Sequence, residues 1–231
     1  MLSESPWYKR FRVLLSLSFL LMVAATLFAQ SGLAVSTFQA LGRGISFLSS
    51  PQLAAQDLST AAHLAPPVNA SKALIRISQL DPNQYSSRAE YDTWAYSACS
   101  TASMTEVFDA YGAHYRITDV LQVEANIGAI TPQLGLTAPE GIQNTAAKFG
   151  FKTTWGNSWS LDSVISNANQ GHPVIVSFPP ARYDGGHLLV VIGGDDANVY
   201  LADTSLWNRH SLSHAQFMAW WGGFAAVVTP N

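Results

Sequence analysis

The chain has 231 residues, of which 48% are hydrophobic and only 12% are charged, and its formal net charge is −3. From Ser71 onward there are eight basic and thirteen acidic residues without a basic stripe, so we expect no nucleic-acid partner. A single cysteine excludes an internal disulfide, and the absence of C-x-x-C and H-E-x-x-H sequences removes the usual zinc signatures.

Residues 1–30 have the pattern of an export signal. Lys9, Arg10 and Arg12 precede residues 13–29, an uncharged apolar run of seventeen residues that is just long enough to cross a bilayer. We therefore expect a cleaved signal peptide or an uncleaved signal anchor, which would make the membrane a partner; a buried helix of the globular domain is the alternative. The positive flank places the rest of the chain outside the cytoplasm, so we expect a secreted or membrane-anchored protein.

The remainder divides into a linker and one domain. Residues 31–70 are rich in Ala, Ser, Gln and Leu and show no lasting helical or strand period, which predicts a low-complexity linker. Residues 71–231 have the length of a single domain and contain no internal repeat. Nothing in the pattern indicates an oligomeric state.

The first part of this domain has helical periodicity. Apolar residues recur at helical spacing over 104–111, which predicts a helix beginning near residues 99–101. A second short helix is expected over residues 117–125. Residues 137–140 read as a capping box that opens a third helix, and Ser160 is the expected cap of a fourth.

After residue 171 the period becomes that of strands. Four short apolar segments bounded by turn residues are expected to be strands, namely PVIVSF, HLLVVIGG, NVYLAD and FAAVVTP. A short helix, HAQFMAWW, is expected before the last strand. Helices followed by an antiparallel sheet predict an α+β fold.

Cys99 is a candidate nucleophile because it lies at the expected start of a helix. Unpaired backbone N–H groups and the helix dipole stabilise negative charge at that end, which favours a thiolate. The alternative is a small, buried structural cysteine.

His187 is the candidate base. It is the first residue of a strongly apolar strand and follows Gly185 and Gly186, a setting in which a substrate backbone can approach closely. The alternative is a histidine that merely ends a strand. The other five histidines have no comparable context.

Asp203 is the candidate group that orients this base. If Gly193 pairs with Ala197, His187 lies directly opposite Asp203, within reach of a hydrogen bond between carboxylate and imidazole. Strand alternation puts both side chains on one face, and a slip of one residue would separate them. Asp203 would then hold the imidazole tautomer and stabilise the imidazolium while His187 takes the thiol proton. The alternative is an aspartate that only initiates a turn.

The order of these segments resembles a known family. A cysteine that opens a helix is followed by GHPVIV, GGHLLVVIGG and VYLAD. This order resembles the bacteriocin-processing, double-glycine-leader cysteine peptidase family of the papain-like superfamily, over about residues 74–228. The resemblance implies a papain-like α+β fold with helices packed against a C-terminal antiparallel sheet. It also implies that Cys99, His187 and Asp203 cleave a peptide or protein substrate through an acyl-enzyme, without metal or cofactor.

Two positions depart from the family pattern. Ser100 and Thr101 stand where the family usually has glycine and then a small residue or proline. The family also has a glutamine shortly before the cysteine that donates to the oxyanion, and Thr93 occupies that position here. Either Gln79 or Gln84 supplies the donor from farther upstream, or the oxyanion site is incomplete, which typically costs ~10²–10³ in turnover.

Two other functions fit the same fold. A catalytically impaired domain would bind peptide or wall polymer at the cell surface, and acyl transfer to an amine would use the same three residues. Residues 155–159, WGNSW, resemble the Asn-Ser-Trp sequence of plant thiol proteases. Because Asn157 precedes His187 instead of following it, we interpret this segment as a loop.

Overall fold

A computed structural model describes residues 69–231 of the chain. The predicted signal segment, residues 1–30, and the predicted linker up to residue 68 lie outside the described residues. Within residues 69–231, no helix combines the length and the apolar character that a membrane crossing requires. The side chain of Asn69 caps the first described helix by accepting a hydrogen bond from the backbone N–H of Lys72.

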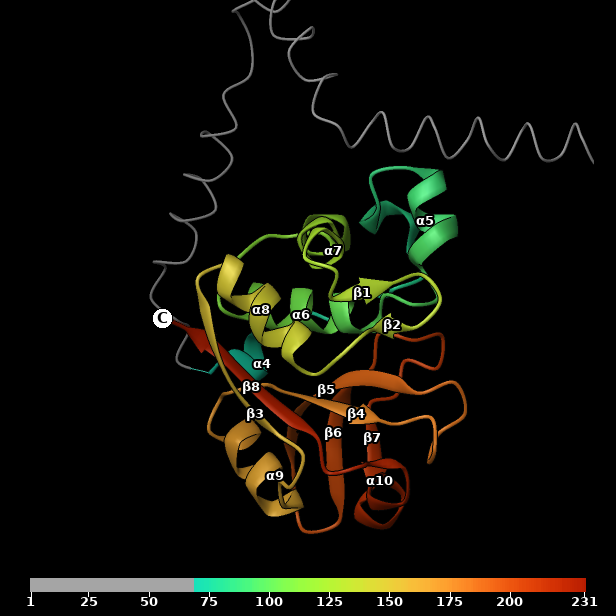
Figure 1. Cartoon of the computed structure of the whole chain (residues 1–231). Coiled ribbons are helices and arrows are strands. Elements are labelled where there is room, and N and C mark those ends of the chain that lie inside the picture. Colours follow the sequence, from blue (N-terminus) through green and yellow to red (C-terminus); the bar gives the residue numbers. More distant parts are fainter. Residues whose placement is uncertain (1–68) are drawn as a thin grey trace, which may run out of the picture. The chain divides into compact units, whose positions relative to one another are not determined.

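Helices dominate the first part of the described chain. Their bounds are α4 Ala70–Ala73, the 3-10 helix η1 Pro82–Gln84, α5 Arg88–Trp94, α6 Cys99–Ala110, α7 Ile117–Asn126, α8 Glu140–Lys148, α9 Leu161–Asn169 and α10 His214–Trp220. Figure 1 shows α5, α6, α7 and α8 together on one side of the sheet, whereas α9 and α10 lie on the other side.

The strands form a small hairpin and one larger sheet. The larger sheet has six strands in the order β3-β8-β4-β5-β6-β7, and every neighbouring pair is antiparallel. The bounds are β1 Ile130–Thr131 and β2 Gly135–Leu136 in the hairpin, then β3 Phe151–Gly156, β4 Val174–Phe178, β5 His187–Gly194, β6 Asn198–Ala202, β7 Ser211–Ser213 and β8 Ala225–Pro230. The predicted α+β fold, with helices packed against an antiparallel sheet, is confirmed.

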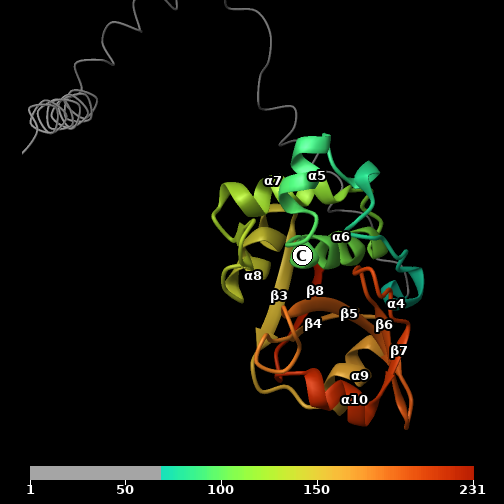
Figure 2. The same cartoon turned by 90° about the vertical axis from the view of Figure 1, so that its right-hand side faces the viewer.

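Both faces of this sheet are buried. Val190 and Ala202 belong to the apolar core that includes α6 and α8. Their strand neighbours Leu189, Val191 and Leu201 belong to a second core, shared with α9 and α10. Figures 1 and 2 show these helices covering the sheet from opposite sides. Coverage on both faces explains why the central strands β4 and β5 are nearly continuous apolar runs.

The helix starts agree with the sequence except at α8. As predicted, Ser160 caps α9, where its Oγ accepts a hydrogen bond from the N–H of Ser163 at 3.1 Å. The capping box predicted at residues 137–140 is wrong, because α8 begins at Glu140 without a side-chain cap. Thr137 instead donates its N–H to the carbonyl of Ala129 at 2.8 Å and closes the β1–β2 hairpin.

The predicted pairing of β5 with β6 is also wrong. Gly193 pairs with Tyr200 and not with Ala197, and Val191 pairs with Leu201 after a register shift. Near the start of β5 the register differs from the prediction by two residues, so the strand alternation is preserved. The side chains of His187 and Asp203 therefore still lie on the same face of the sheet, as predicted, although the predicted register is wrong.

Strand β3 was not predicted. It lies at one edge of the sheet and includes Trp155 and Gly156, so the loop interpretation of residues 155–159 applies only to residues 157–159.

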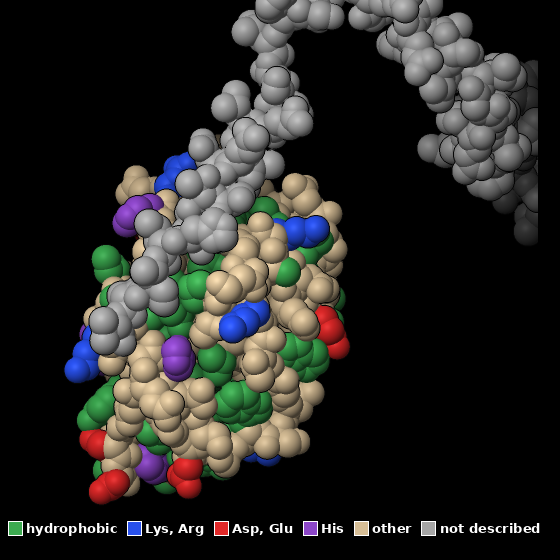
Figure 3. Space-filling view, turned by 90° about the vertical axis from the view of Figure 1, so that its left-hand side faces the viewer, with side chains coloured by type: hydrophobic (Ala, Val, Ile, Leu, Met, Phe, Trp, Pro, Cys, Tyr) green, Lys and Arg blue, Asp and Glu red, His purple; other side chains and the backbone are tan. Residues whose placement is uncertain are grey.

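On the face in Figure 3, the visible Lys and Arg side chains of the described residues stand apart from one another.

Candidate active site

Cys99 is the first residue of α6, as the sequence predicted. The preceding residue, Ala98, makes no side-chain capping bond, so no side chain competes for the N–H groups at this end of the helix. The helix has twelve residues, and its dipole favours negative charge at Cys99. The cysteine is partly exposed.

His187 is the first residue of β5 and is almost completely buried. Gly185 and Gly186 precede it with φ values of 79° and 66°, a left-handed conformation that side chains disfavour. A Cβ on Gly186 would lie 2.9 Å from Cγ of Pro180, so this turn also requires glycine for space. The turn brings the imidazole to the end of the strand.

Asp203 follows the last residue of β6 and is also buried. Its Oδ1 accepts a hydrogen bond from His187 Nε2 at 2.8 Å, across the pair of strands. A second hydrogen bond reaches Oδ1 from the N–H of Ser205 at 3.0 Å. In the observed register Asp203 is therefore diagonal to His187 and not directly opposite, and the two side chains still meet.

These contacts determine the charge of the imidazole. Burial opposes protonation of His187, but hydrogen bonds and charge interactions with Asp203 and Cys99 outweigh it and raise the pKa of His187 to about 9. Burial also opposes ionisation of Asp203, yet its hydrogen bonds with His187 and Ser205 hold the pKa of this carboxyl well below its usual range. At neutral pH the pair is therefore an imidazolium bound to a carboxylate.

The sulfur and the imidazole share a cavity of about 380 Å³. Cys99 comes from the helical side of this cavity and His187 from the sheet side. Because Nε2 of His187 is held by Asp203, Nδ1 is the ring nitrogen left for the thiol. The structure thus brings the three predicted residues together, because Cys99 and His187 line one cavity and His187 is hydrogen bonded to Asp203.

Gln79 lies next to Thr204, which follows Asp203, whereas Gln84, the other candidate oxyanion donor, and Thr93 lie elsewhere. Its Oε1 accepts from Thr204 Oγ1 at 3.0 Å, and its Nε2 donates one hydrogen to the carbonyl of Ala95 at 2.9 Å. Gln84 is bound to the N–H of Ile117, and Thr93 is exposed on α5. The 3-10 helix and α5 form the insertion that separates Gln79 from the cysteine.

The departure from the family pattern at Ser100 and Thr101 also has a structural reason. Ser100 donates its hydroxyl to Oε1 of Glu124 at 2.8 Å, and Thr101 donates its hydroxyl to the other oxygen. Glu124 is completely buried on α7, and this burial raises its pKa to about 7. The two hydroxyl residues therefore join α6 to α7 directly behind the cysteine.

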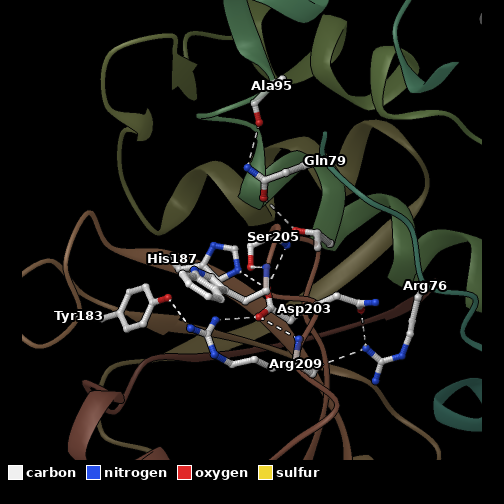
Figure 4. A network of polar contacts seen from close by, with 11 residues as sticks. Arg76, Gln79, Ala95, Tyr183, His187, Asp203, Ser205 and Arg209 are labelled. Atoms are coloured by element: carbon white, nitrogen blue, oxygen red, sulfur yellow. Dashed lines mark hydrogen bonds and ion pairs between the residues drawn. The ribbon is translucent and has the colours of Figure 1, made fainter. Parts of the chain in front are cut away.

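Arg209 is a site residue that the sequence analysis missed. Its Nη1 lies 3.0 Å from Oδ2 of Asp203, and its Nη2 donates to the hydroxyl of Tyr183 at 2.9 Å. Figure 4 shows Asp203 between His187 and Arg209, with Tyr183 beyond the guanidinium. An arginine in an irregular loop has no periodic signal, and its proximity in sequence to Asp203 was the only available indication.

Glu106 is a second missed residue, two helical turns after Cys99 on α6. It is completely buried; its Oε1 accepts from the N–H of Ile77 at 3.0 Å, and its Oε2 has no hydrogen-bond partner. Burial raises the pKa of Glu106 to about 8, although the nearby Arg76 opposes this effect. Among the described residues there is no group of three or more His, Cys, Asp and Glu side chains arranged to hold a metal ion.

Comparison with known proteins gives one family and several similar solved structures. The model of the Peptidase_C39 like family matches residues 72–227. The peptidase domain of Streptococcus ComA, a bifunctional ABC transporter of a quorum-sensing pathway, is 23% identical with a TM-score of 0.49, over 58% of this chain and 93% of that chain. A double-glycine-motif protease from an AMS/PCAT transporter, in complex with the leader peptide, is 14% identical with a TM-score of 0.46, over 68% and 92% of the two chains. No curated protein matches the chain.

Proposed function

Because the chain belongs to the Peptidase_C39 like family, we propose that it is an extracytoplasmic thiol peptidase that hydrolyses peptide bonds. In this proposal Cys99 is the nucleophile, His187 is the general base and acid, and Asp203 orients the imidazole. The observation that carries the proposal is that the only thiol of the chain lines the same cavity as a buried imidazole, which is hydrogen bonded to a buried carboxylate.

The first half of the reaction forms an acyl-enzyme. In the reactive form the proton of Cys99 already resides on Nδ1 of His187, as an imidazolium beside a thiolate, and the thiolate attacks the carbonyl carbon of the scissile bond. As the tetrahedral intermediate collapses, the C–N bond breaks and the imidazolium gives its proton to the leaving amine. The product is a thioester on Cys99 and a free amine.

The second half reverses these roles with water. His187 takes a proton from the water that attacks the thioester, the C–S bond breaks, and the carboxylic acid leaves. Through both halves Asp203 keeps Nε2 protonated by accepting its hydrogen bond, so Nδ1 remains the nitrogen that exchanges protons.

The oxyanion of the tetrahedral intermediate needs donors placed in advance. The backbone N–H of Cys99 at the start of α6 is one candidate, because no side chain caps this end. The second is the Nε2 hydrogen of Gln79 that does not bond to Ala95. This assignment explains how a glutamine far upstream in sequence replaces the family's nearer one.

The location outside the cytoplasm rests on the sequence alone. Residues 9–12 supply the positive flank and residues 13–29 the apolar run of a signal peptide or signal anchor. Protease accessibility of the domain in intact cells tests this location. If added protease cleaves the domain only after the cells are lysed, the domain is inside the cell and the proposed location is contradicted.

The activity is tested with quenched fluorescent peptides and the variant Cys99→Ala. The wild type should release product and lose activity on treatment with iodoacetamide, and Cys99→Ala should show neither turnover nor labelling. Turnover that persists in Cys99→Ala would discard the mechanism. A matched variant is Ser103→Ala on the same helix, which removes a buried hydroxyl that has no partner and leaves the thiol in place.

Two other results would redirect the assignment. Alkylation of Cys99 that appears only at alkaline pH, together with peptide binding that survives Cys99→Ala, would favour a binding module for peptide or wall polymer. Formation of an amide with an added amine, at the expense of the hydrolysis product, would favour acyl transfer by the same residues.

A further inference from the structure

A completely buried carboxyl on α7 is bonded to the two residues that follow Cys99 and takes no part in the proposed reaction. Glu124 accepts the hydroxyl of Ser100 at 2.8 Å with one carboxyl oxygen and the hydroxyl of Thr101 with the other. Both hydroxyl residues are also completely buried in the first turn of α6. One carboxyl of a neighbouring helix thus binds both side chains next to the sulfur-bearing residue.

We propose that Glu124 is a positioning residue for the nucleophile: by holding Ser100 and Thr101 it fixes the first turn of α6 and the N–H groups that stabilise negative charge at Cys99. The inference rests on the proposed thiol peptidase activity and adds a residue that acts on the sulfur only through its neighbours. The family usually has glycine directly after the cysteine. Because glycine has no hydroxyl group, the family pattern does not supply this arrangement.

The start of α6 lacks a capping side chain. Ala98 precedes the helix and makes no side-chain capping bond. The first backbone hydrogen bond of the helix runs from the N–H of Ala102 to the carbonyl of Ala98 at 2.9 Å, so the N–H groups of residues 99–101 have no carbonyl of the helix to bind. Helix ends fray, and a capping side chain normally opposes this. The two hydrogen bonds to Glu124 hold this turn from the side instead.

Glu124 can hold the turn because α7 is itself fixed against α6. One apolar cluster joins α7 to the start of α6 and includes Ile117 and Leu121 from α7 with Ala98 and Ala102 beside the cysteine. Figure 1 shows the two helices as neighbours on the same side of the sheet. In addition, the carbonyl of Glu124 accepts the N–H of Ala129 at 2.9 Å, which ties the end of α7 to the segment before β1.

The burial of this carboxyl is not explained by a cation. None of the ion pairs among residues 69–231 includes Glu124. Burial raises the pKa of Glu124 to about 7, although the hydrogen bonds from Thr101 and Ser100 oppose this effect. A buried polar group whose partners are all in place favours one arrangement of the two helices, because any other arrangement leaves buried hydroxyl groups unpaired.

The test measures how fast iodoacetamide alkylates Cys99 in the folded protein at about pH 6, where a free thiol is almost entirely protonated. Glu124→Met keeps the length of the side chain and removes both hydrogen bonds. If the first turn loosens, its N–H groups no longer stabilise the thiolate, and we expect the alkylation rate to fall about 10-fold. We also expect kcat to fall with little change in KM, since the turn carries a candidate oxyanion donor.

Two further variants separate the hydrogen bonds from the packing. Glu124→Gln should restore the rate almost to the wild-type value, because its oxygen accepts from one hydroxyl and its NH₂ group donates to the other. Ser100→Ala combined with Thr101→Val removes the same bonds from the side of α6. This pair should lower the rate as much as Glu124→Met, and joining all three changes should add little. The pair also provides the test if Glu124→Met does not fold.

The matched control is Ser103→Ala, which removes a buried hydroxyl without a partner from the same helix and should alkylate like the wild type. Thermal unfolding is measured for every variant. If Glu124→Met and the Ser100→Ala, Thr101→Val pair only lower the unfolding temperature while their folded forms alkylate at the wild-type rate, the positioning role is overturned. A wild-type Cys99 that reacts no faster than in the urea-unfolded chain would overturn it too.

These outcomes are distinct from the failure of the proposed activity, because alkylation needs no substrate. The expected order of alkylation rates supports the positioning role of Glu124 even if the wild type cleaves no peptide. Conversely, a wild type that cleaves peptides, together with a Glu124→Met variant of unchanged alkylation rate and kcat, would overturn this inference and leave the thiol peptidase in place.

Discussion

Arg209 binds Asp203 through the carboxylate oxygen that His187 does not use. Its Nη1 and its backbone N–H reach Oδ2 at 3.0 and 3.2 Å, while Nε2 of His187 holds Oδ1 at 2.8 Å. The guanidinium also lies over the rings of Tyr183 and Trp220, at 5.4 and 5.3 Å from their centroids. Both oxygens of the Asp203 carboxylate are thus occupied, and the arginine is itself held in place.

The first prediction concerns the charge of Arg209. Arg209→Met keeps much of the apolar stem but removes the cation, so the negative charge of Asp203 acts on His187 alone. We expect kcat/KM to fall about 10-fold and the basic limb of its pH profile to move to higher pH, because the imidazolium is further stabilised. Arg209→Lys restores the charge and should bring the limb back toward its original position.

A purely structural role for Arg209 would give a different result. Both variants would then lose activity in proportion to their loss of stability, and neither would displace the pH limb. Arg88→Met is a suitable control, since Arg88 pairs with Asp92 on the exposed surface of α5. Thermal unfolding of each variant separates the two explanations.

The second prediction concerns Asp203. Asp203→Asn removes the charge that stabilises the imidazolium, so the pKa of His187 should fall from about 9. The basic limb of kcat/KM should move to lower pH, and kcat should fall by as much as about 10⁴, the loss seen when other triads suffer this change. A pH profile measured from pH 5 to 10 checks both expectations. An unchanged basic limb would mean that Asp203 does not control the base.

The third prediction distinguishes the two glutamines. If Gln79 supplies an oxyanion donor, Gln79→Ala should lower kcat by ~10²–10³ with little change in KM, because the interaction exists only in the transition state. Gln84→Ala should leave kcat near the wild-type value, since Gln84 bonds to the backbone of Ile117. Equal losses in both variants would assign Gln79 a structural role beside Thr204 and Ala95.

The elements that the sequence predicted well are those with a strong local period. The helix at Cys99 and the strand at His187 begin where apolar spacing and flanking glycines indicated. The register of the β5–β6 hairpin could not be predicted from a local period, because it depends on the geometry of the turn that joins the two strands. Asp195 closes this turn by accepting N–H groups from Ala197 and Asn198, which moves the pairing beyond Ala197.

The positions of the polar groups behind the site, in contrast, could not be predicted from any local period. Arg209 and Glu106 reach the region around His187 and Asp203 through tertiary contacts between segments that no spacing rule connects. Glu106 even interrupts the apolar face of α6 while remaining completely buried. From sequence alone a glutamate is expected on the surface, so the burial of Glu106 could be recognised only from the three-dimensional structure.

The last prediction concerns this buried carboxyl and the stability of the fold. Burial raises the pKa of Glu106 to about 8 in the folded state, above its ordinary value of 4.5. The folded protein therefore holds the proton over a pH range in which the unfolded chain has lost it. The contribution of Glu106 is complete below about pH 4.5 and is lost as the pH rises through about 8.

Glu106→Gln should remove this dependence while it preserves the shape of the side chain. Between pH 5 and 8 the wild type should lose up to about 1.4 kcal/mol of unfolding free energy per pH unit more than the variant. Urea unfolding at several pH values measures the difference. Glu140→Gln, an exposed carboxylate at the start of α8, is the control and should follow the wild type. Parallel pH curves for Glu106→Gln and the wild type would show that the buried carboxyl is ionised in the folded protein.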